Sequence, residues 1–425
     1  MQSCRVLKQK PDVICRRDPF GIISGLRKSR YPPVLKTDFL IIGAGLSGLT
    51  LAERLSSECG ASCLIVEKRE AIGGNSRDEF DRHGVLVHSY GPHYFRTDSS
   101  RVVEYLSRFT EWIPGKFSIL SYSGGRYWNF PINLNTFEQF LGRESTGEEF
   151  EAWLNEKRIP VVNPSNSEEF IVSRLGREFY EQFFRNYTRK QWGRDASELD
   201  PSVCGRIPIR IDRDDRYLRE KFQALPREGY HTMFRRMIEA SPGVELLTGT
   251  DFREVIGRIE HRHLIFTAPI DEYFDYCYGP LPYRSLRFEQ EHFTTEQLQE
   301  ADRVVIAGKV GFWQPAVQVN YPNDEAYTRI VEMKHATGQQ CAGTTIVREY
   351  PEEHAPGKEP YYPMPTTGAR ELHAKYARKA AKLPRVSFVG RLASYRYLNM
   401  DQAVGMALDE AERLADLYFA SRRTK

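Results

Sequence analysis

The chain contains no apolar run that approaches the roughly twenty residues a helix needs to cross a membrane. Its seven cysteines are scattered without a C-x-x-C pair or a regular spacing. The sequence therefore predicts neither a metal site nor a disulfide framework, and it favours a reducing, cytoplasmic location. The net charge of +3 is small for 425 residues, which gives no general reason to expect nucleic acid or a charged membrane as a partner.

Length and composition instead indicate a large globular protein. The chain is 40% hydrophobic and 28% charged, and its length suits two or three domains with sizeable cores. Residues 1–36 are basic and contain several prolines. They lack the long apolar core of a secretory signal, so we interpret them as an N-terminal extension and assign them no function.

A nucleotide-binding pattern follows this extension. An apolar run from Asp38 enters G-x-G-x-x-G at Gly43, Gly45 and Gly48, and a second apolar run ends at Glu67. This order is typical of a βαβ unit that places a pyrophosphate on a helix N-terminus and a ribose against the carboxylate. The pattern predicts a Rossmann-like domain for FAD or NAD, and an ordinary strand, turn and helix is the alternative interpretation.

The next segment favours FAD over NAD. A Gly73-Gly74 pair follows the ribose-binding acid, and this arrangement resembles the FAD-binding flavoproteins that include the amine oxidases. A simple glycine turn is the alternative interpretation.

The rest of the chain alternates between strand and helix patterns. A hairpin is predicted over 117–130 around the glycines at 124–125, and amphipathic helix over 136–191. Further strands are predicted over 244–247, 263–267, 304–307, 316–321, 343–347 and 386–391, and a last helix over 401–422.

Ten short strings, in this order, carry more information than their spacing does. They are GPHYFRT (91–97), FPINL (130–134), KQWG (190–193), DDRY (214–217), KFQ (221–223), PIDEYF (269–274), YRSL (283–286), YTR (327–329), EPYYP (359–363) and GRL (390–392). Through them the chain resembles the UDP-galactopyranose mutase family, from about Asp38 to the last helix.

The resemblance implies an α/β fold with a discontinuous FAD-binding domain at 37–109, 229–283 and 366–425. It also implies an inserted helical substrate domain at 136–200 and an antiparallel sheet domain at 110–135, 201–228 and 284–365. The bacterial members of the family suggest a homodimer.

The resemblance further implies an isomerase that interconverts the pyranose and furanose rings of a nucleotide sugar, UDP-galactose above all, without net redox change. In that family, reduced FAD attacks the anomeric carbon through N5 and expels the nucleoside diphosphate, and an iminium adduct lets the ring open and reclose. The protein orients the sugar and stabilises charge on the diphosphate.

The site residues carried over from the family fall into three groups. The predicted catalytic residues are Arg206, Arg329, Tyr362, Tyr397, His93 and Arg96. The predicted cofactor-binding residues are Gly43, Gly45, Gly48, Glu67, Lys68, Gly74, Asn75, Gly91, Arg391, Asn399, Met400 and Asp401. The predicted substrate-binding residues are Phe183, Tyr187, Trp192, Tyr217, Arg284 and Asn320. Taken singly, an arginine is more often a surface charge, a tyrosine a packing residue and His93 a satisfied buried histidine.

Three departures from the family pattern involve four residues. Arg96 stands where the family has a second histidine, Asn399 stands where it usually has an aspartate, and Asp212-Arg213 replaces an asparagine and an aromatic residue. Unlike histidine, arginine keeps its charge near neutral pH. We therefore expect Arg96 to favour the anionic reduced flavin and to raise the flavin potential relative to Arg96→His.

These departures leave alternatives open. The same chemistry could act on a GDP- or dTDP-linked hexose, or on a deoxy or N-acetyl sugar. An FAD-dependent oxidoreductase of the amine-oxidase type and a noncatalytic FAD-binding relative are further alternatives.

Overall fold

The computed structural model of the chain describes residues 16–17, 23–24, 35–308, 310–355 and 357–423. Most of the predicted N-terminal extension, 1–36, lies outside the described residues. Within it, β1 (Arg16–Arg17) pairs with β2 (Ile23–Ser24).

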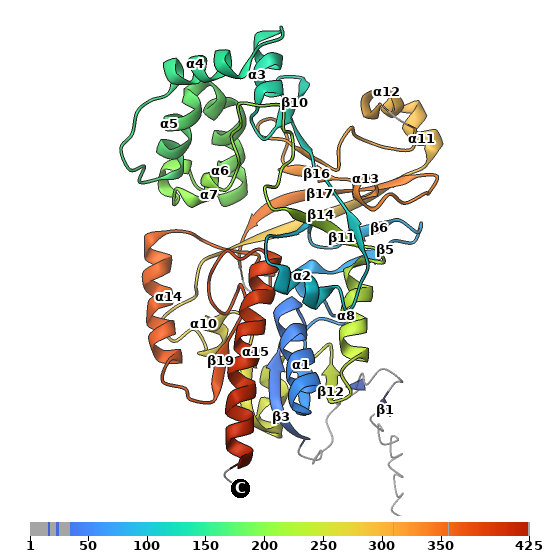
Figure 1. Cartoon of the computed structure of the whole chain (residues 1–425), viewed down its shortest axis with the longest axis vertical. Coiled ribbons are helices and arrows are strands. Elements are labelled where there is room, and N and C mark those ends of the chain that lie inside the picture. Colours follow the sequence, from blue (N-terminus) through green and yellow to red (C-terminus); the bar gives the residue numbers. More distant parts are fainter. Residues whose placement is uncertain (1–15, 18–22, 25–34, 309, 356, 424–425) are drawn as a thin grey trace, which may run out of the picture.

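A parallel sheet forms the base of the molecule in Figure 1. Its strands, from edge to edge, are β12 (Val244–Leu247), β4 (Cys63–Val66), β3 (Leu35–Ile42), β13 (Ile259–Phe266) and β19 (Val386–Phe388). All four residues of β4 are buried, as is the second half of β3, because a parallel sheet is covered on both faces. The strands predicted over 244–247 and 263–267 are confirmed.

Helices cover this sheet. α1 (Leu46–Cys59) packs against the last helix, α15 (Met400–Arg423), and against α8 (Gly229–Glu239). α1 ends at Gly60, whose φ of 60° is the left-handed conformation that glycine adopts most readily. α15 confirms the helix predicted over 401–422. α2 (Ser100–Leu106) lies beside it.

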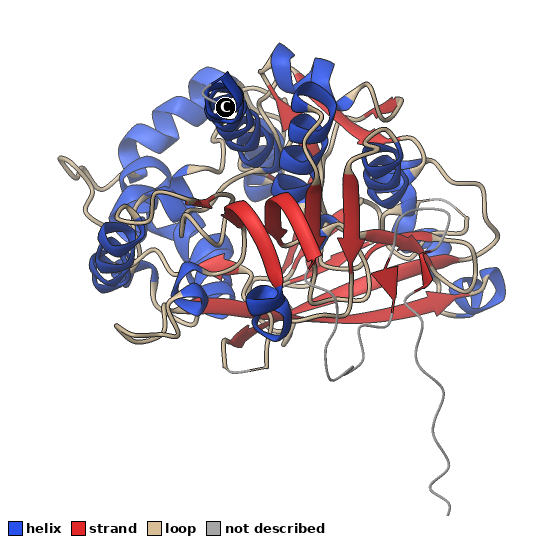
Figure 2. Cartoon of the chain, turned by 90° about the horizontal axis from the view of Figure 1, so that it is seen from below, coloured by secondary structure: helices blue, strands red, loops and turns tan. Residues whose placement is uncertain are grey.

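A second, largely antiparallel sheet of seven strands lies across the middle of the molecule. In order, its strands are β10 (Arg126–Phe130), β9 (Ile119–Ser123), β15 (Gln318–Asn320), β16 (Arg329–Val331), β17 (Thr344–Glu353), β14 (Tyr283–Phe293) and β18 (Tyr362–Pro363). Figure 2 shows most of the helices on one side of its long strands. The predicted hairpin is confirmed: Gly124 and Gly125 have φ of 60° and 77°, as a two-residue type I′ turn requires.

The helical region follows this hairpin and groups at the top of Figure 1. Its segments are α3 (Leu134–Leu141), α4 (Gly147–Lys157), α5 (Ser167–Phe179), a π-helical turn (Tyr180–Arg185), α6 (Asn186–Trp192), a 3₁₀ turn (Ala196–Glu198) and α7 (Ser202–Gly205). Asn133, Thr146 and Asn166 cap α3, α4 and α5. Aromatic side chains fill the space between the helices, as the stacked rings of Phe137 and Phe150 illustrate.

Small elements connect these three parts. A three-stranded sheet orders β7 (Phe95–Thr97), β11 (Phe222–Pro226) and β8 (Trp112–Pro114), and β5 (Asp78–Phe80) pairs with β6 (Leu86–His88). The short helices are α9 (Phe252–Val255), α10 (Ile270–Tyr273), α11 (Thr295–Glu300), α12 (Arg303–Ala307) and α13 (Lys334–Thr337), with 3₁₀ turns at Gly74–Ser76 and Ile256–Arg258. α14 (Thr367–Ala380) is longer.

The strand predicted over 304–307 is wrong, because α12 occupies those residues. Asp302 and Gly308 on either side have positive φ, 51° and 72°, so the helix ends after little more than one turn. An apolar run of four residues fits a strand or a buried helical turn equally well. The exact domain boundaries stay a prediction.

Candidate active site

The turn between β3 and α1 has the geometry of an anion-binding site. Gly43 has a φ of 103°, and a Cβ there would lie 2.3 Å from Thr267 Oγ1. A Cβ on Gly48 would lie 2.0 Å from the Gly43 carbonyl oxygen, so only glycine allows α1 to pack this closely. Gly45 has no side chain to cap α1, which leaves the first N–H groups of the helix available to a phosphate.

Glu67 lies at the end of β4 beside this turn and is 6% exposed. Its Oε2 accepts a hydrogen bond from the Ala44 N–H at 2.7 Å, and its Oε1 accepts one from the Arg69 N–H at 2.9 Å. An ionised carboxylate has about four acceptor positions, so the anchored Glu67 can still accept hydrogen bonds from a ribose.

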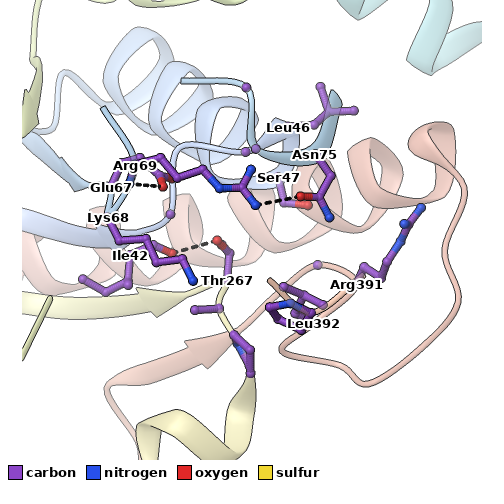
Figure 3. A pocket seen from close by; sticks show the side chains of 18 of the residues that line it. Ile42, Leu46, Ser47, Glu67, Lys68, Arg69, Asn75, Thr267, Arg391 and Leu392 are labelled. Atoms are coloured by element: carbon purple, nitrogen blue, oxygen red, sulfur yellow. Dashed lines mark hydrogen bonds between the residues drawn. The ribbon is translucent and has the colours of Figure 1, made fainter. Parts of the chain in front are cut away.

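Arg69 connects this turn to the rest of the site, as Figure 3 shows in part. Its Nη2 donates to Asn75 Oδ1 at 2.9 Å and to Glu359 Oε2 at 2.9 Å, and its guanidinium lies 4.4 Å from the centre of the Tyr90 ring. Lys68 Nζ lies 3.2 Å from the same Glu359 oxygen. Arg69 and Glu359 were not among the predicted site residues, although Arg69 follows the predicted Lys68 and Glu359 begins the string EPYYP.

Two cavities meet at this site. The first surrounds the β3–α1 turn and is lined by Gly43, Gly45, Glu67, Lys68 and Gly74 among others. The second is lined by the predicted residues Gly91, Arg96, Tyr187, Trp192, Arg206, Tyr217, Arg329, Tyr362 and Tyr397. Asn75, His93, Arg391, Asn399 and Met400 line both. A dinucleotide in the first cavity can therefore reach a ligand in the second.

Arg329 is held rigidly in the second cavity. Its Nε and Nη2 donate to the two oxygens of Glu349 at 2.9 and 2.7 Å, and Glu349 is 1% exposed. The two residues are direct partners in the β16–β17 ladder. Burial alone would lower the pKa of Arg329, but Glu349 together with Tyr187 and Tyr362 outweighs it, and the pKa lies well above the usual value. Glu349 was not predicted from the sequence as a site residue. The signal that could have indicated it is its place two residues after the buried Val347, on the same inward face of the strand.

Arg206 supplies a second cation at the end of α7. Its guanidinium lies 4.9 Å from the centre of the Tyr397 ring, and that of Arg391 lies 5.4 Å from it. Tyr362 stacks on the same ring at 5.5 Å. Desolvation in the cavity would raise the pKa of Tyr397, but Arg206 and Arg391 outweigh it and lower the pKa. The cations and phenol groups together favour an anionic ligand such as a diphosphate.

His93 is neutral at the wall between the cavities. Its Nδ1 lies 2.8 Å from the Gly91 carbonyl oxygen; because a carbonyl only accepts, Nδ1 carries the proton and Nε2 is an acceptor. Burial, assisted by Arg391 and Arg329, lowers the pKa of His93 to about 4.

Arg96 is paired, which the sequence did not indicate. Its Nη2 donates to Asn399 Oδ1 at 3.1 Å, and its Nε lies 3.2 Å from Glu220 Oε1. Two of the three departures from the family pattern are thus in direct contact. The third lies elsewhere: Asp212 and Arg213 line neither cavity, and Arg213 pairs with Glu138 of α3.

The structure places some predicted residues behind the cavity walls. Phe183 is a core residue whose ring lies 5.5 Å from that of Trp128. Arg284 donates to the backbone carbonyls of Gln191 and Lys190 at 3.1 and 3.3 Å, at the end of α6. Asn320 accepts from Gln318 Nε2 at 2.9 Å. Gly48 and Asp401 also lie outside the lining.

The fold and the joined cavities define a protein of the Rossmann dinucleotide-binding class. Residues 41–109 match the family model of the NAD(P)-binding Rossmann-like domain, and residues 182–397 match that of UDP-galactopyranose mutase. The chain belongs to the UDP-galactopyranose mutase family, and it is an enzyme of the isomerase class.

Individual relatives agree with this assignment. The chain is 36% identical to a Klebsiella pneumoniae protein named "Probable UDP-galactopyranose mutase", over 88% of this chain and 94% of the relative. It is 32% identical to a dTDP-fucopyranose mutase of Escherichia coli, over 90% and 99%. A crystal structure of reduced UDP-galactopyranose mutase shares the fold, with a TM-score of 0.68 and 17% identity over 90% of this chain and 96% of that one.

Two kinds of feature are absent from the described residues. In that part of the chain, no helix is long and apolar enough to cross a membrane. The same residues contain no group of three or more His, Cys, Asp or Glu side chains that could hold a metal ion.

Proposed function

We propose that the chain is an FAD-dependent mutase that, with its flavin reduced, interconverts the pyranose and furanose forms of a nucleotide sugar. The observation that carries this proposal is the meeting of the two cavities at a shared wall: one has the geometry of a dinucleotide site, and the other is lined by four arginines and several phenol groups. The solved mutase that shares the fold is described as reduced, which supports a redox-active cofactor.

The first cavity fits FAD. The free N–H groups of α1 and the glycine turn would hold the pyrophosphate, and Glu67 would hold the ribose. Arg391, Asn399 and Met400 belong to both cavities and would contact the reacting end. When bound and reduced, FAD supplies a nucleophilic nitrogen that displaces the diphosphate from the anomeric carbon.

The protein's own residues would then orient the substrate and stabilise the leaving group. Arg206 and Arg329 would bind the diphosphate oxygens, assisted by the hydroxyls of Tyr362 and Tyr397, because charge develops there as the bond breaks. Tyr187, Trp192 and Tyr217 offer aromatic faces to the nucleoside. Burial raises the pKa of Tyr187 to about 12, so its hydroxyl stays a donor at neutral pH.

The sugar also has a protein partner available. Gln191 is 4% exposed and lines the second cavity, and its Oε1 has no hydrogen-bond partner among the described residues. A buried acceptor left unpaired costs about 1–3 kcal/mol, so a sugar hydroxyl that donates to it would be favoured.

UDP-galactose is the substrate we propose. A dTDP-linked deoxy sugar is the second candidate, since the Escherichia coli relative is named a dTDP-fucopyranose mutase. Asp212 and Arg213, one of the departures that left other nucleotides and sugars open, line neither cavity, and this favours UDP-galactose. A homodimer stays a prediction.

The direct test is turnover of UDP-galactofuranose by the flavin-loaded protein, reduced with dithionite without oxygen. The six-membered ring is the more stable, so the proposal expects chromatography to show UDP-galactopyranose. Parallel reactions with GDP- and dTDP-linked furanoses decide the nucleotide. A flavin-loaded, reduced protein that converts none of these sugars would overturn the mutase proposal.

A further inference from the structure

Three side chains from separate segments meet around Arg96 beside the wall that the two cavities share, and Glu220 contacts Arg96 without lining either cavity. Arg96 belongs to β7, Glu220 to the loop before β11, and Asn399 to the loop before α15. The ion pair between Arg96 and Glu220 measures 3.2 Å, and their side chains are 24% and 25% exposed. Arg96 and Asn399 line the second cavity, and Asn399 also lines the first.

Asn399 is held in place by the start of α15. Its N–H donates to Gln402 Oε1 at 2.9 Å, and its carbonyl accepts from the Ala403 N–H at 3.0 Å. These bonds fix its backbone, so its amide oxygen is a stationary acceptor for Arg96 Nη2 at 3.1 Å. Arg96 is therefore anchored on two sides, by a charged oxygen on Nε and by a neutral oxygen on Nη2.

We propose that Glu220 and Asn399 are positioning residues for Arg96, and that the three together set the balance between reduced and oxidised cofactor. This inference rests on the proposed function, which places FAD in the first cavity. Arg96 favours the reduced form, because that form can carry a negative charge that the oxidised form lacks. Glu220 opposes part of this effect, and Asn399 keeps the cation at the wall without adding charge.

The two partners of the ion pair should therefore act in opposite directions. Arg96→Met removes the cation and should lower the ratio of reduced to oxidised cofactor about tenfold at a fixed ambient potential, about 30 mV for a two-electron couple. Glu220→Gln keeps an acceptor for Arg96 Nε and removes the anion, so it should raise that ratio by a similar factor. The double variant R96M/E220Q lacks both charges and should return to within about threefold of wild type.

Shifts of the reduced-to-oxidised ratio in opposite directions distinguish this electrostatic role from a general disruption of the cofactor site. A variant that loosens the packing of the cofactor would shift the ratio the same way whichever partner is replaced. A matched control is the pair Arg194 and Glu198, whose charged atoms lie 3.0 Å apart and whose residues line neither cavity. R194M and E198Q should leave the ratio unchanged.

The experiment is an anaerobic redox titration of each flavin-loaded protein against a reference dye, with flavin content and visible spectrum recorded first. Opposite shifts with recovery in the double variant support the proposal. Shifts of the same sign, or no shift in R96M and E220Q with flavin bound, would overturn it. A wild-type protein that binds no flavin would instead remove the proposed function, and this inference with it.

Discussion

A bound nucleoside diphosphate should stabilise the variant Glu349→Gln more than it stabilises the wild-type protein. Glu349 is 1% exposed and accepts hydrogen bonds from two nitrogens of Arg329. Glutamine keeps the volume and one acceptor but leaves the buried guanidinium without its counter-charge. Removing one partner of a buried ion pair costs about 3–5 kcal/mol, so we expect about 3 kcal/mol less unfolding free energy without ligand.

A diphosphate should return part of that loss, because its oxygens offer Arg329 a new anionic partner. A hydrogen bond to a charged group contributes about 1.5–3 kcal/mol, and about 1.4 kcal/mol is a tenfold change in affinity. UDP should therefore bind E349Q about tenfold more tightly than wild type. At a UDP concentration 100 times the wild-type Kd, wild type gains about 2.7 kcal/mol and the variant about 4.1 kcal/mol.

The assay combines urea unfolding, with and without UDP, and titration calorimetry of UDP. The matched control is Glu291→Gln on neighbouring β14: Glu291 pairs with Arg348, its side chain is 47% exposed, and such a surface pair contributes about 0–1 kcal/mol. If UDP binds E349Q no more tightly than wild type, or if E291Q shows the same gain in affinity, Glu349 does not limit the binding of a diphosphate to Arg329.

Three further predictions concern stability and binding. Burial lowers the pKa of His88 to about 3, so the unfolded chain takes up a proton below about pH 6.5 that the folded chain refuses. The wild-type free energy of unfolding should therefore fall as the pH is lowered. The difference in this free energy between wild type and H88Q, measured by urea unfolding, should shrink by about 2 kcal/mol between pH 7.5 and pH 5, and a constant difference would contradict this. Gly91→Ala should destabilise the protein more than Gly84→Ala does. Both glycines have positive φ, but only at Gly91 would a Cβ meet Glu349, at 3.0 Å. Equal losses of stability in thermal unfolding would count against this contact. Lys190→Met removes a donor to three backbone carbonyls of the β15–β16 connection. Because this connection leads to Arg329 at the start of β16, KM should rise more than kcat falls. An unchanged KM would argue against a role of Lys190 in positioning Arg329.

The parts of the site that could be predicted from sequence are those whose geometry is local. Gly43, Gly45 and Gly48 lie within one turn and the helix it starts, and a short strand then delivers Glu67 beside them. Local steric limits therefore determine their roles. The same is true of the glycines that close the β9–β10 hairpin.

The residues that were missed owe their roles to contacts between distant segments. Glu349 matters because sheet register places it opposite Arg329, and its sequence neighbourhood contains other glutamates that stay exposed or half-exposed. Glu220 lies far from Arg96 and Asn399 along the chain, so no local pattern connects them. Arg284 was predicted from its motif to bind substrate, but its guanidinium instead donates to backbone carbonyls at the end of α6.

The proposed mechanism requires the flavin to act without net redox change. The most direct measurement follows product formation and the visible absorbance of the flavin together in one anaerobic cuvette containing reduced enzyme and excess UDP-galactofuranose. The proposed mechanism predicts many turnovers with the flavin still reduced at the end, and no turnover with the oxidised enzyme. Reoxidation of the flavin in step with product, or equal turnover by the oxidised enzyme, would contradict it.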